Sequence, residues 1–168
     1  MRLDSVQFDA AVRTHQDMVF SIAWHFLRDR HSAEDVAQEV FFELHRHLDA
    51  IESDAHMTNW LRRVASRRCI DRTRRLRLRP RVGLESASEP SVPAQPGDPF
   101  LRDHLQRLLD GLPARSRMAV ILRFQEDMEL TEVASAMGIP VGSVKSTLHR
   151  ALRFLREKLE RTANGVVR

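Results

Sequence analysis

Apolar side chains recur at steps of three and four residues along most of this 168-residue chain, which is the spacing of one buried helix face. Few β-branched runs and only six glycines occur, so helix is favoured almost everywhere. The pattern predicts helices over residues 6–27, 33–48 and 59–79, a further helix from Phe100, and two helices that meet at Gly138. We therefore predict an all-α protein.

The predicted helix 33–48 carries two stripes of side chains. Ser32 is a candidate N-cap, because its hydroxyl can accept a hydrogen bond from the first turn. The core stripe consists of Val36, Val40, Phe41, Leu44 and Leu48. The other stripe consists of Asp35, Gln38, Glu39, Phe42 and Arg46. Phe42 on this polar face is either an anchor for a partner or a residue packed under a neighbouring loop, and the sequence leaves both open.

The next predicted helix is strongly cationic. Residues 49–57 are predicted to form a connecting loop, with Thr58 or Asn59 capping the helix that follows. Its buried side consists of Trp60, Leu61, Val64 and Ala65. Against the single acid Asp71 stand Arg62, Arg63, Arg67, Arg68, Arg72, Arg74, Arg75, Arg77, Arg79 and Arg81. A solvated surface helix normally mixes both signs, so this one-sided charge indicates neutralisation by nucleic-acid phosphates.

The composition changes between Pro80 and Pro99, where five of the seven prolines lie among Ser, Gly and acidic residues. Neither a helix nor a strand pattern survives there, so residues 80–99 are predicted to be a flexible, extended linker. The linker divides the chain into two small helical domains, 1–79 and 100–168. About nineteen extended residues reach roughly 65 Å, close to the roughly 70 Å between two DNA elements two helical turns apart.

The second domain is predicted to contain a helix-turn-helix. Its first helix has an apolar face made by Phe100, Leu101, Leu105, Leu108 and Leu109. Gly111 ends that helix, and Pro113 suits the start of the next. Further on, a short helix is predicted to end at Met137. Gly138 would take the positive φ at which helices commonly stop, and a second helix would begin at about Val141.

The predicted helix from Val141 has one buried stripe and one cationic face. The buried stripe consists of Val144, Leu148, Ala151, Leu152, Leu155 and Leu159. The outward residues, none of them acidic, are Ser143, Lys145, Ser146, His149, Arg150 and Arg153. Such a helix can lie in a DNA major groove, with its first turns at base edges and its cations at phosphates. The alternative is an ordinary solvated face, because this motif also occurs in folds that bind no DNA.

Charge is distributed in blocks, although the net charge is only +4. Residues 1–58 sum to about −6, 59–82 to about +9, 83–110 to about −3 and 111–168 to about +4. Two positive segments separated by an acidic one indicate two places that meet a polyanion. No apolar run is long enough to span a bilayer and no signal-peptide core is present, so the cell interior is the expected compartment.

No catalytic constellation, Gly-rich phosphate loop or nucleophile motif occurs in the sequence, so neither an enzymatic activity nor a cofactor is expected. His45 and His47 point in different directions on a helix, which makes them a poor metal pair. Cys69 is the single cysteine, which excludes an internal disulfide and a thiolate-rich zinc site. Its thiol has either a pKa lowered by the arginines or a half-buried structural role, and we favour the second.

Several segments resemble, in their order and spacing, those of a known family. The segments are AEDVAQEVF, WLRRVA followed by ID and RR, a linker, LP, and GIPVGSVKSTLHRALRFLR. Together they resemble the extracytoplasmic-function (ECF) group of bacterial sigma factors in the sigma-70 family, which keeps only regions two and four. The resemblance covers nearly the whole chain except the linker and the ends. It implies a non-enzymatic subunit that directs core RNA polymerase to specific promoters and assists in melting them.

The resemblance also implies three sets of contact residues. The stripe matching region 2.2, which docks on the clamp helices of the largest polymerase subunit, consists of Asp35, Gln38, Glu39 and Phe42. The residues expected at the -10 promoter element, beside the loop from Ile51, are Asn59, Trp60, Arg62, Arg63, Arg67, Arg68 and Arg75. Those matching region 4.2, which reads the -35 element, are Ser143, Lys145, Ser146, His149, Arg150 and Arg153. The implied partners are core polymerase (clamp helices and flap), promoter DNA and, as in many relatives, an anti-sigma factor, with no membrane insertion.

Two positions depart from the family's pattern. Members often carry Asn where this chain has Arg67, at the pocket that accepts a flipped -10 base. A guanidinium is longer, always charged and donor-only, so we expect Arg67 to favour a base that offers acceptors. Members also often have Gly and then a Ser or Thr helix cap before the turn, where this chain has Asp127 and Glu129. The start of that helix is therefore left open.

Two other classes of protein compete with a sigma subunit. A stand-alone helix-turn-helix regulator with an N-terminal helical effector domain would also carry the helix from Val141. It would leave unexplained the arginine helix and the linker between two basic elements. An RNA-binding or nucleolytic enzyme would need an acid cluster for metal ions, which the sequence lacks. We therefore predict a sigma subunit with two small helical domains.

Overall fold

Every element in the described part of the chain is a helix, which confirms the all-α prediction. The computed structural model describes residues 2–78 and 98–165, so most of the predicted linker, residues 80–97, lies outside the described residues. Three long helices come first, joined in one place by the short 3-10 turn η1 (Leu48–Ala50). They are α1 (Arg2–Leu27), α2 (Arg30–His47) and α3 (Asp54–Leu78).

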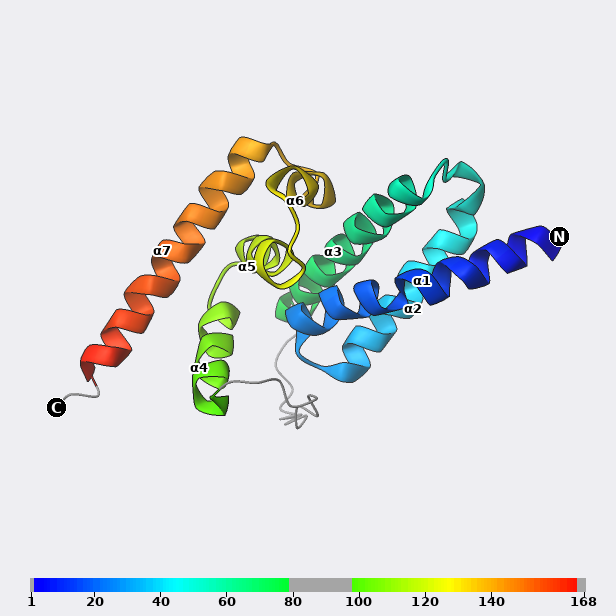
Figure 1. Cartoon of the computed structure of the whole chain (residues 1–168). Helices are drawn as coiled ribbons and strands as arrows, with labels where there is room; N and C mark the ends of the chain where they lie inside the picture. The colour runs from blue at the N-terminus through cyan, green and yellow to red at the C-terminus, as the bar shows by residue number, and fades with distance from the viewer. Residues whose placement is uncertain (1, 79–97, 166–168) are drawn as a thin grey trace.

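The second half begins with α4 (Pro99–Asp110) and contains the helix-turn-helix. Between these two parts lie α5 (Ala114–Val120) and the π-helical turn η2 (Ile121–Gln125). The helix-turn-helix consists of α6 (Leu130–Met137) and α7 (Val141–Gly165). Figure 1 shows α5 and α6 lying between α7 on one side and the three N-terminal helices on the other.

The three N-terminal helices bury their predicted apolar faces against one another. The core stripe of α2 is confirmed at Val36, Val40, Phe41 and Leu44, which are buried. Leu48 is only partly buried, because the chain has left the α-helix there and entered η1. The largest fully buried side chains of this part are Phe26, Ile22, Leu44 and Leu61.

The N-cap of α2 is Asp29, so the prediction of Ser32 as the cap is wrong. Arg28 takes a positive φ of 57°, which turns the chain, and Asp29 then adopts an extended conformation. The Asp29 carboxylate accepts a hydrogen bond from the backbone N–H of Ser32 at 2.8 Å. A carboxylate three residues earlier therefore satisfies the N–H group of the first turn, and the helix starts before Ser32.

The start of α3 also lies earlier than predicted. The hydroxyl oxygen of Ser53 accepts a hydrogen bond from the backbone N–H of His56 at 3.1 Å, which is the contact of an N-cap. Thr58 lies within the helix and donates its hydroxyl to the Asp54 carbonyl at 2.9 Å. Neither Thr58 nor Asn59 caps the helix, and the predicted loop 49–57 is shorter than expected.

The helix-turn-helix has the predicted boundaries. Gly138 has a φ of 63°, and its N–H donates to the carbonyl of Ser135 at 3.3 Å. Before the turn, Asp127 takes a positive φ of 50°, and Glu129 then caps α6. The N–H of Glu129 donates to the Glu132 carboxylate at 2.8 Å. The Glu132 carboxylate therefore makes the return contact of a capping box, from the third helical residue back to the backbone of the cap.

The buried stripe of α7 is narrower than predicted. Four of its six residues are buried, namely Val144, Leu148, Ala151 and Leu155. Leu152 is 39% exposed, and its place in the stripe is therefore wrong. At about 100° per residue it lies about 80° around the helix from Val144, beyond the contact with α5 and α6. Leu159 is partly buried.

Only one end of the predicted apolar face of α4 is covered. Leu108 and Leu109 are partly buried, near the place where Gly111 ends the helix. Phe100, Leu101 and Leu105 are exposed, so the prediction of a single packed face holds for the last turns alone. α4 is therefore an amphipathic helix whose first turns present apolar side chains to solvent.

The two halves pack directly against each other, chiefly through α6 against α3 and η2 against α1. The guanidinium of Arg117 lies 4.3 Å from the centre of the Phe26 ring. The hydroxyl of Ser21 on α1 donates to the Glu126 carboxylate at 2.6 Å. One apolar core runs from the first half into the second, so α3 is covered on one side by α6.

Candidate nucleic-acid interface

All six residues predicted to face outward on α7 are exposed. The first turns form a shallow hollow beside the open backbone of Gly142. Two side chains bond back to their own helix: Ser146 Oγ donates to the Gly142 carbonyl at 3.0 Å and Arg150 Nε to the Ser146 carbonyl at 3.3 Å. Arg150 keeps its terminal N–H groups for another partner, so the face still offers donors and positive charge.

The exposed side of α3 gathers four polar or cationic residues. Asn59, Arg63, Arg67 and Arg74 are all exposed and follow one another at spacings of four and seven, which places them on one side of a helix. Trp60 lies beside this row and is partly buried, with its ring 5.8 Å from the His47 ring. A nucleic acid can reach this row in the described arrangement, as it can reach the exposed arginines at the C-terminal end of α3.

Two predicted -10 residues face α6. Arg62 donates to the Glu132 carboxylate at 2.9 Å, and its side chain is only 19% exposed. The guanidinium of Arg63 lies 3.4 Å from the place that a β-carbon would occupy on Gly138. The helix-turn-helix therefore covers most of Arg62 and lies beside the still exposed Arg63, and Glu132 supplies Arg62 with a negative charge.

Acidic residues of α2 neutralise further arginines of α3. Arg72 pairs with Asp35 at 3.1 Å, and Arg68 pairs with Glu39 at 3.3 Å and with Glu43 at 2.6 Å. Arg67 pairs with Glu43 at 2.9 Å. The expectation that phosphates alone neutralise this helix is therefore wrong in part. Arg75 is exposed near the C-terminal end of α3 and lines a small polar pocket with Arg68 and Arg72.

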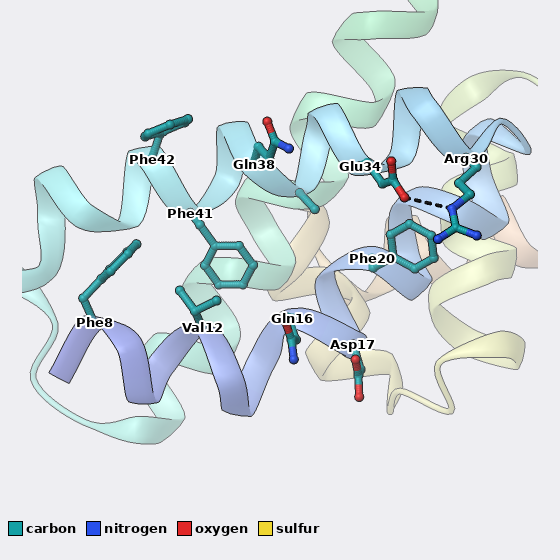
Figure 2. A pocket seen from close by; sticks show the side chains of 11 residues that line it. Phe8, Val12, Gln16, Asp17, Phe20, Arg30, Glu34, Gln38, Phe41 and Phe42 are labelled. Atoms are coloured by element: carbon teal, nitrogen blue, oxygen red, sulfur yellow. Dashed lines mark hydrogen bonds and ion pairs between the residues drawn. The ribbon is translucent and has the colours of Figure 1, made fainter. Parts of the chain in front are cut away.

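The residues of the predicted polymerase stripe on α2 lie in two different environments. Phe42 is 70% exposed, so it does not pack under any loop of residues 2–78 or 98–165. It stands with Gln38 beside an apolar groove of about 600 Å³ between α1 and α2, whose walls include Phe8, Val12, Phe20 and Phe41 (Figure 2). Asp35 and Glu39 instead face the arginines of α3.

Cys69 is fully buried on α3. Burial raises the pKa of its thiol to about 12, although the charges of Arg72 and Arg117 act in the opposite direction. The alternative of a lowered thiol pKa is therefore wrong, and the thiol is buried more deeply than the expected half-buried cysteine.

Three carboxylates in this region were not among the predicted site residues: Glu43, Glu126 and Glu132. A signal for the first exists in the sequence, since Asp35, Glu39 and Glu43 repeat every four residues and Arg68 and Arg72 do the same. Within residues 2–78 and 98–165, no group of three or more His, Cys, Asp and Glu side chains could hold a metal ion. None of the described helices is long and apolar enough to cross a membrane.

Two family profiles match the chain: Sigma-70 region 2 over residues 11–79 and Sigma-70, region 4 over residues 102–155. The RNA polymerase sigma-E factor of Streptomyces avermitilis is 35% identical over 157 residues, which span 92% of this chain and 86% of that protein. The ECF RNA polymerase sigma factor SigE of Mycolicibacterium smegmatis is 32% identical over 90% of this chain. The alignment spans 61% of the length of SigE.

The fold is also that of solved sigma factors. RpoE in complex with the anti-sigma factor NepR from Bartonella quintana superposes with a TM-score of 0.71 at 21% identity, covering 92% of this chain and 97% of that one. Regions 2 and 4 are thus both present, in the predicted order. The chain belongs to the sigma-70 family of RNA polymerase sigma factors, in its ECF group.

Proposed function

We propose that this chain brings core RNA polymerase to specific promoters and helps to melt them, without catalysing a reaction itself. The observation that carries the proposal is the pair of cationic helix faces, on α3 and on the first turns of α7, one in each matched region. A regulator that only located DNA would need one such face. Two faces in one chain suit two promoter elements that are recognised together.

The first turns of α7 are proposed to read the -35 element in the major groove. Ser143, Lys145 and His149 are exposed on these turns, directly after the helix-turn-helix turn. Residues at the start of such a recognition helix reach base edges, whereas cations further along it meet phosphates. Arg150 and Arg153 are the proposed phosphate contacts, and Ser146 completes the exposed face.

The exposed row of α3 is proposed to hold the melted -10 element. Arginines along one helix side can follow a DNA backbone, and Trp60 with the loop at Ile51 would replace part of the lost base stacking. Taking a base out of the stack costs a few kcal/mol, which such contacts must supply. Arg67 is the proposed determinant of base choice. Arg62 becomes available to DNA only when α6 moves away from it.

Phe42 and Gln38 are proposed to dock on the clamp helices of the largest polymerase subunit. An exposed aromatic side chain beside an apolar groove has the character of an interface anchor. Asp35 and Glu39 would add polar contacts along the edge of the same helix. For the second half, the proposed contact is the polymerase flap, supported by the exposed apolar residues Phe100, Leu101 and Leu105 on α4.

An anti-sigma factor is proposed as a further partner. The similar RpoE was solved in complex with the anti-sigma factor NepR, and the similar CnrH with the cytosolic domain of CnrY. The exposed apolar residues of α2 and α4 offer surface that such a partner could cover. All the proposed partners of this chain act inside the cell, which is the proposed compartment.

The test is transcription from defined DNA with purified components. Core polymerase with this chain should start transcripts at fixed positions on templates selected from a random promoter library, and core polymerase alone should not. Loss of those transcripts when the -10 or the -35 segment is scrambled is also expected. Tight binding to DNA without any promoter-specific transcript would instead favour a stand-alone helix-turn-helix regulator.

A further inference from the structure

A ladder of ion pairs joins α2 to α3. Three acids are spaced four residues apart on α2: Asp35, Glu39 and Glu43. Asp35 pairs with Arg72, Glu39 pairs with Arg68, and Glu43 pairs with both Arg68 and Arg67. Positions rise along α2 as they fall along α3, so the two helices run antiparallel. Two acids of the ladder, Asp35 and Glu39, belong to the predicted polymerase stripe, and its arginines belong to the proposed DNA helix.

Glu43 is the acid of the ladder that holds two arginines through both of its oxygens. One oxygen accepts from Arg68 Nε at 3.2 Å and from Nη2 at 2.6 Å, and the other accepts from Arg67 Nη2 at 2.9 Å. The Glu43 side chain is 18% exposed. Its burial would raise the pKa, but the hydrogen bonds and charges of Arg68 and Arg67 outweigh burial and lower it. Glu43 is therefore ionised at neutral pH.

The two arginines differ in how many N–H donors they keep for another partner. Arg68 uses Nε and both terminal nitrogens on Glu43 and Glu39, so most of its donors point at acids. Arg67 uses one terminal nitrogen on Glu43 and is 59% exposed. A guanidinium has five N–H donors in a rigid fork. Arg67 therefore keeps donors for a nucleic acid while one side of its fork is fixed.

We infer that Glu43 is a positioning residue for promoter recognition: it fixes the direction in which Arg67 presents its free donors, with Arg68 bracing the carboxylate. This inference rests on the proposed role of α3 at the -10 element. A guanidinium that is already anchored loses less freedom on meeting a base and reaches fewer alternative phosphates. Glu43 thereby favours discrimination between bases over general attraction to the DNA backbone.

The consequence of removing the anchor can be stated in advance. In Glu43→Gln the amide keeps the shape of the side chain but loses its charge, so Arg67 is free to turn toward phosphates. Discrimination at the base that Arg67 reads should fall by about threefold or more, within the range of a lost base contact. Binding to all sequences should stay equal or rise, and the salt dependence should steepen by up to about one phosphate contact.

The experiment uses core polymerase saturated with the full chain. Binding of labelled single-stranded -10 oligonucleotides, with each of the four bases at every position, is measured for wild type, Glu43→Gln, Arg67→Asn and the double variant. If Glu43 acts through Arg67, the two single variants change the ranking at the same position. The double variant then behaves like Arg67→Asn alone, because the two residues act as one unit.

Two further variants separate position from charge. Glu160→Gln removes the same charge from an exposed place on α7 and should leave the -10 base ranking unchanged. Glu43→Asp keeps the charge on a shorter arm, so one carboxylate can no longer reach both guanidinium groups as it does now. Glu43→Asp should therefore change the ranking in the same direction as Glu43→Gln. It also covers the case in which Glu43→Gln fails to fold, which thermal melting of the free protein reveals.

Three outcomes would overturn the inference: an unchanged ranking in Glu43→Gln, equal effects of Glu43→Gln and Glu160→Gln, or an undiminished effect of Glu43→Gln in the Arg67→Asn background. Each would mean that Glu43 contributes only to the stability or the net charge of the protein and does not position Arg67. A wild-type protein that starts no promoter-specific transcript would refute the proposed function itself, so the two failures are distinguishable.

Discussion

Arg62 on α3 donates to Glu132 on α6 across 2.9 Å, although the two residues are 70 positions apart in the chain. The Glu132 carboxylate therefore occupies a donor of Arg62 that the proposed contact with a DNA phosphate would use. In this closed arrangement, the proposed -35 motif covers part of the proposed -10 helix. Simultaneous contact with two elements roughly 70 Å apart therefore requires the two halves to separate.

We expect Glu132→Gln to favour separation of the two halves. Arg62 and Glu132 are only partly shielded from water, so the pair contributes on the order of 1 kcal/mol, or a roughly fivefold change in the equilibrium constant between the closed and the open arrangement. Energy transfer between dyes attached at Gln7 and Glu160 would report the change. Glu34→Gln is the matched control, because it breaks a 2.8 Å pair with Arg30 within α2. Equal transfer in both variants would contradict the prediction.

Acidification should strengthen the contact between α1 and η2. Burial raises the pKa of Glu126, despite its hydrogen bond from Ser21. Glu126 therefore binds a proton more readily in the closed arrangement than in the open one. The closed arrangement gains stability as the pH falls through this raised pKa toward the ordinary value, and the gain is complete below the ordinary value.

The predicted increase in closing at low pH is tested by comparing wild type with Glu126→Gln between pH 7.5 and 4.5, using the same dye pair. Gln has no proton to gain, so the variant should lack the component of closing that Glu126 supplies. Burial lowers the pKa values of His15 and His25, and their protonation destabilises the first half in both proteins alike. A pH profile that is the same in both proteins would mean that Glu126 is not the responsible group.

Phe42→Ala should weaken binding to core polymerase by about 30-fold, because truncation of an interfacial aromatic anchor costs about 2 kcal/mol or more. The side chain is largely exposed, so the melting temperature of the free protein should hardly change. Leu78→Ala removes another exposed apolar side chain, at the end of α3, and should leave the affinity unchanged. A binding titration that shows equal affinities for both variants would exclude Phe42 as an anchor.

Alanine variants of Lys145, Ser146, His149 and Arg150 should separate base contacts from phosphate contacts. A side chain that reads a base carries about 1–3 kcal/mol of discrimination, whereas a phosphate contact weakens all sequences alike. We expect an altered base preference for at least one variant on a panel of -35 mutants. Arg161→Ala, an exposed cation far from the turn, should alter none. If all four variants lose affinity equally on every DNA, these residues contact phosphates only.

Local chemistry made the helix-turn-helix predictable. Gly138 needs a positive φ, Pro140 cannot continue a helix, and the apolar spacing from Val144 repeats over several turns, so neighbouring residues alone determine these features. Helix starts were less predictable. Both Asp29 and Ser32 can cap a helix, and the backbone turn at Arg28 decides which one caps α2. Ser53, Thr58 and Asn59 all lie near the start of α3, and the end of η1 decides which one caps that helix.

Contacts between distant helices could not be predicted from the periodicity. The spacing shows that Arg62 is off the core stripe, but not that α6 brings Glu132 to it. The ladder from Asp35 to Glu43 depends on the axial register between α2 and α3, which the core side chains set. For the same reason the sequence indicated one-sided charge on α3, whereas the folded chain supplies acids to four of its arginines.

The depth at which Cys69 lies has a consequence for oxidative signalling. With a thiol pKa of about 12, only on the order of one molecule in 100,000 carries the reactive thiolate at pH 7. That thiolate is the form that attacks hydrogen peroxide and glutathione disulfide, and no other cysteine is present in the sequence. The folded chain is therefore insensitive to both oxidants at its cysteine. A transcriptional response that depends on cysteine oxidation would therefore have to begin in a different molecule that binds this one.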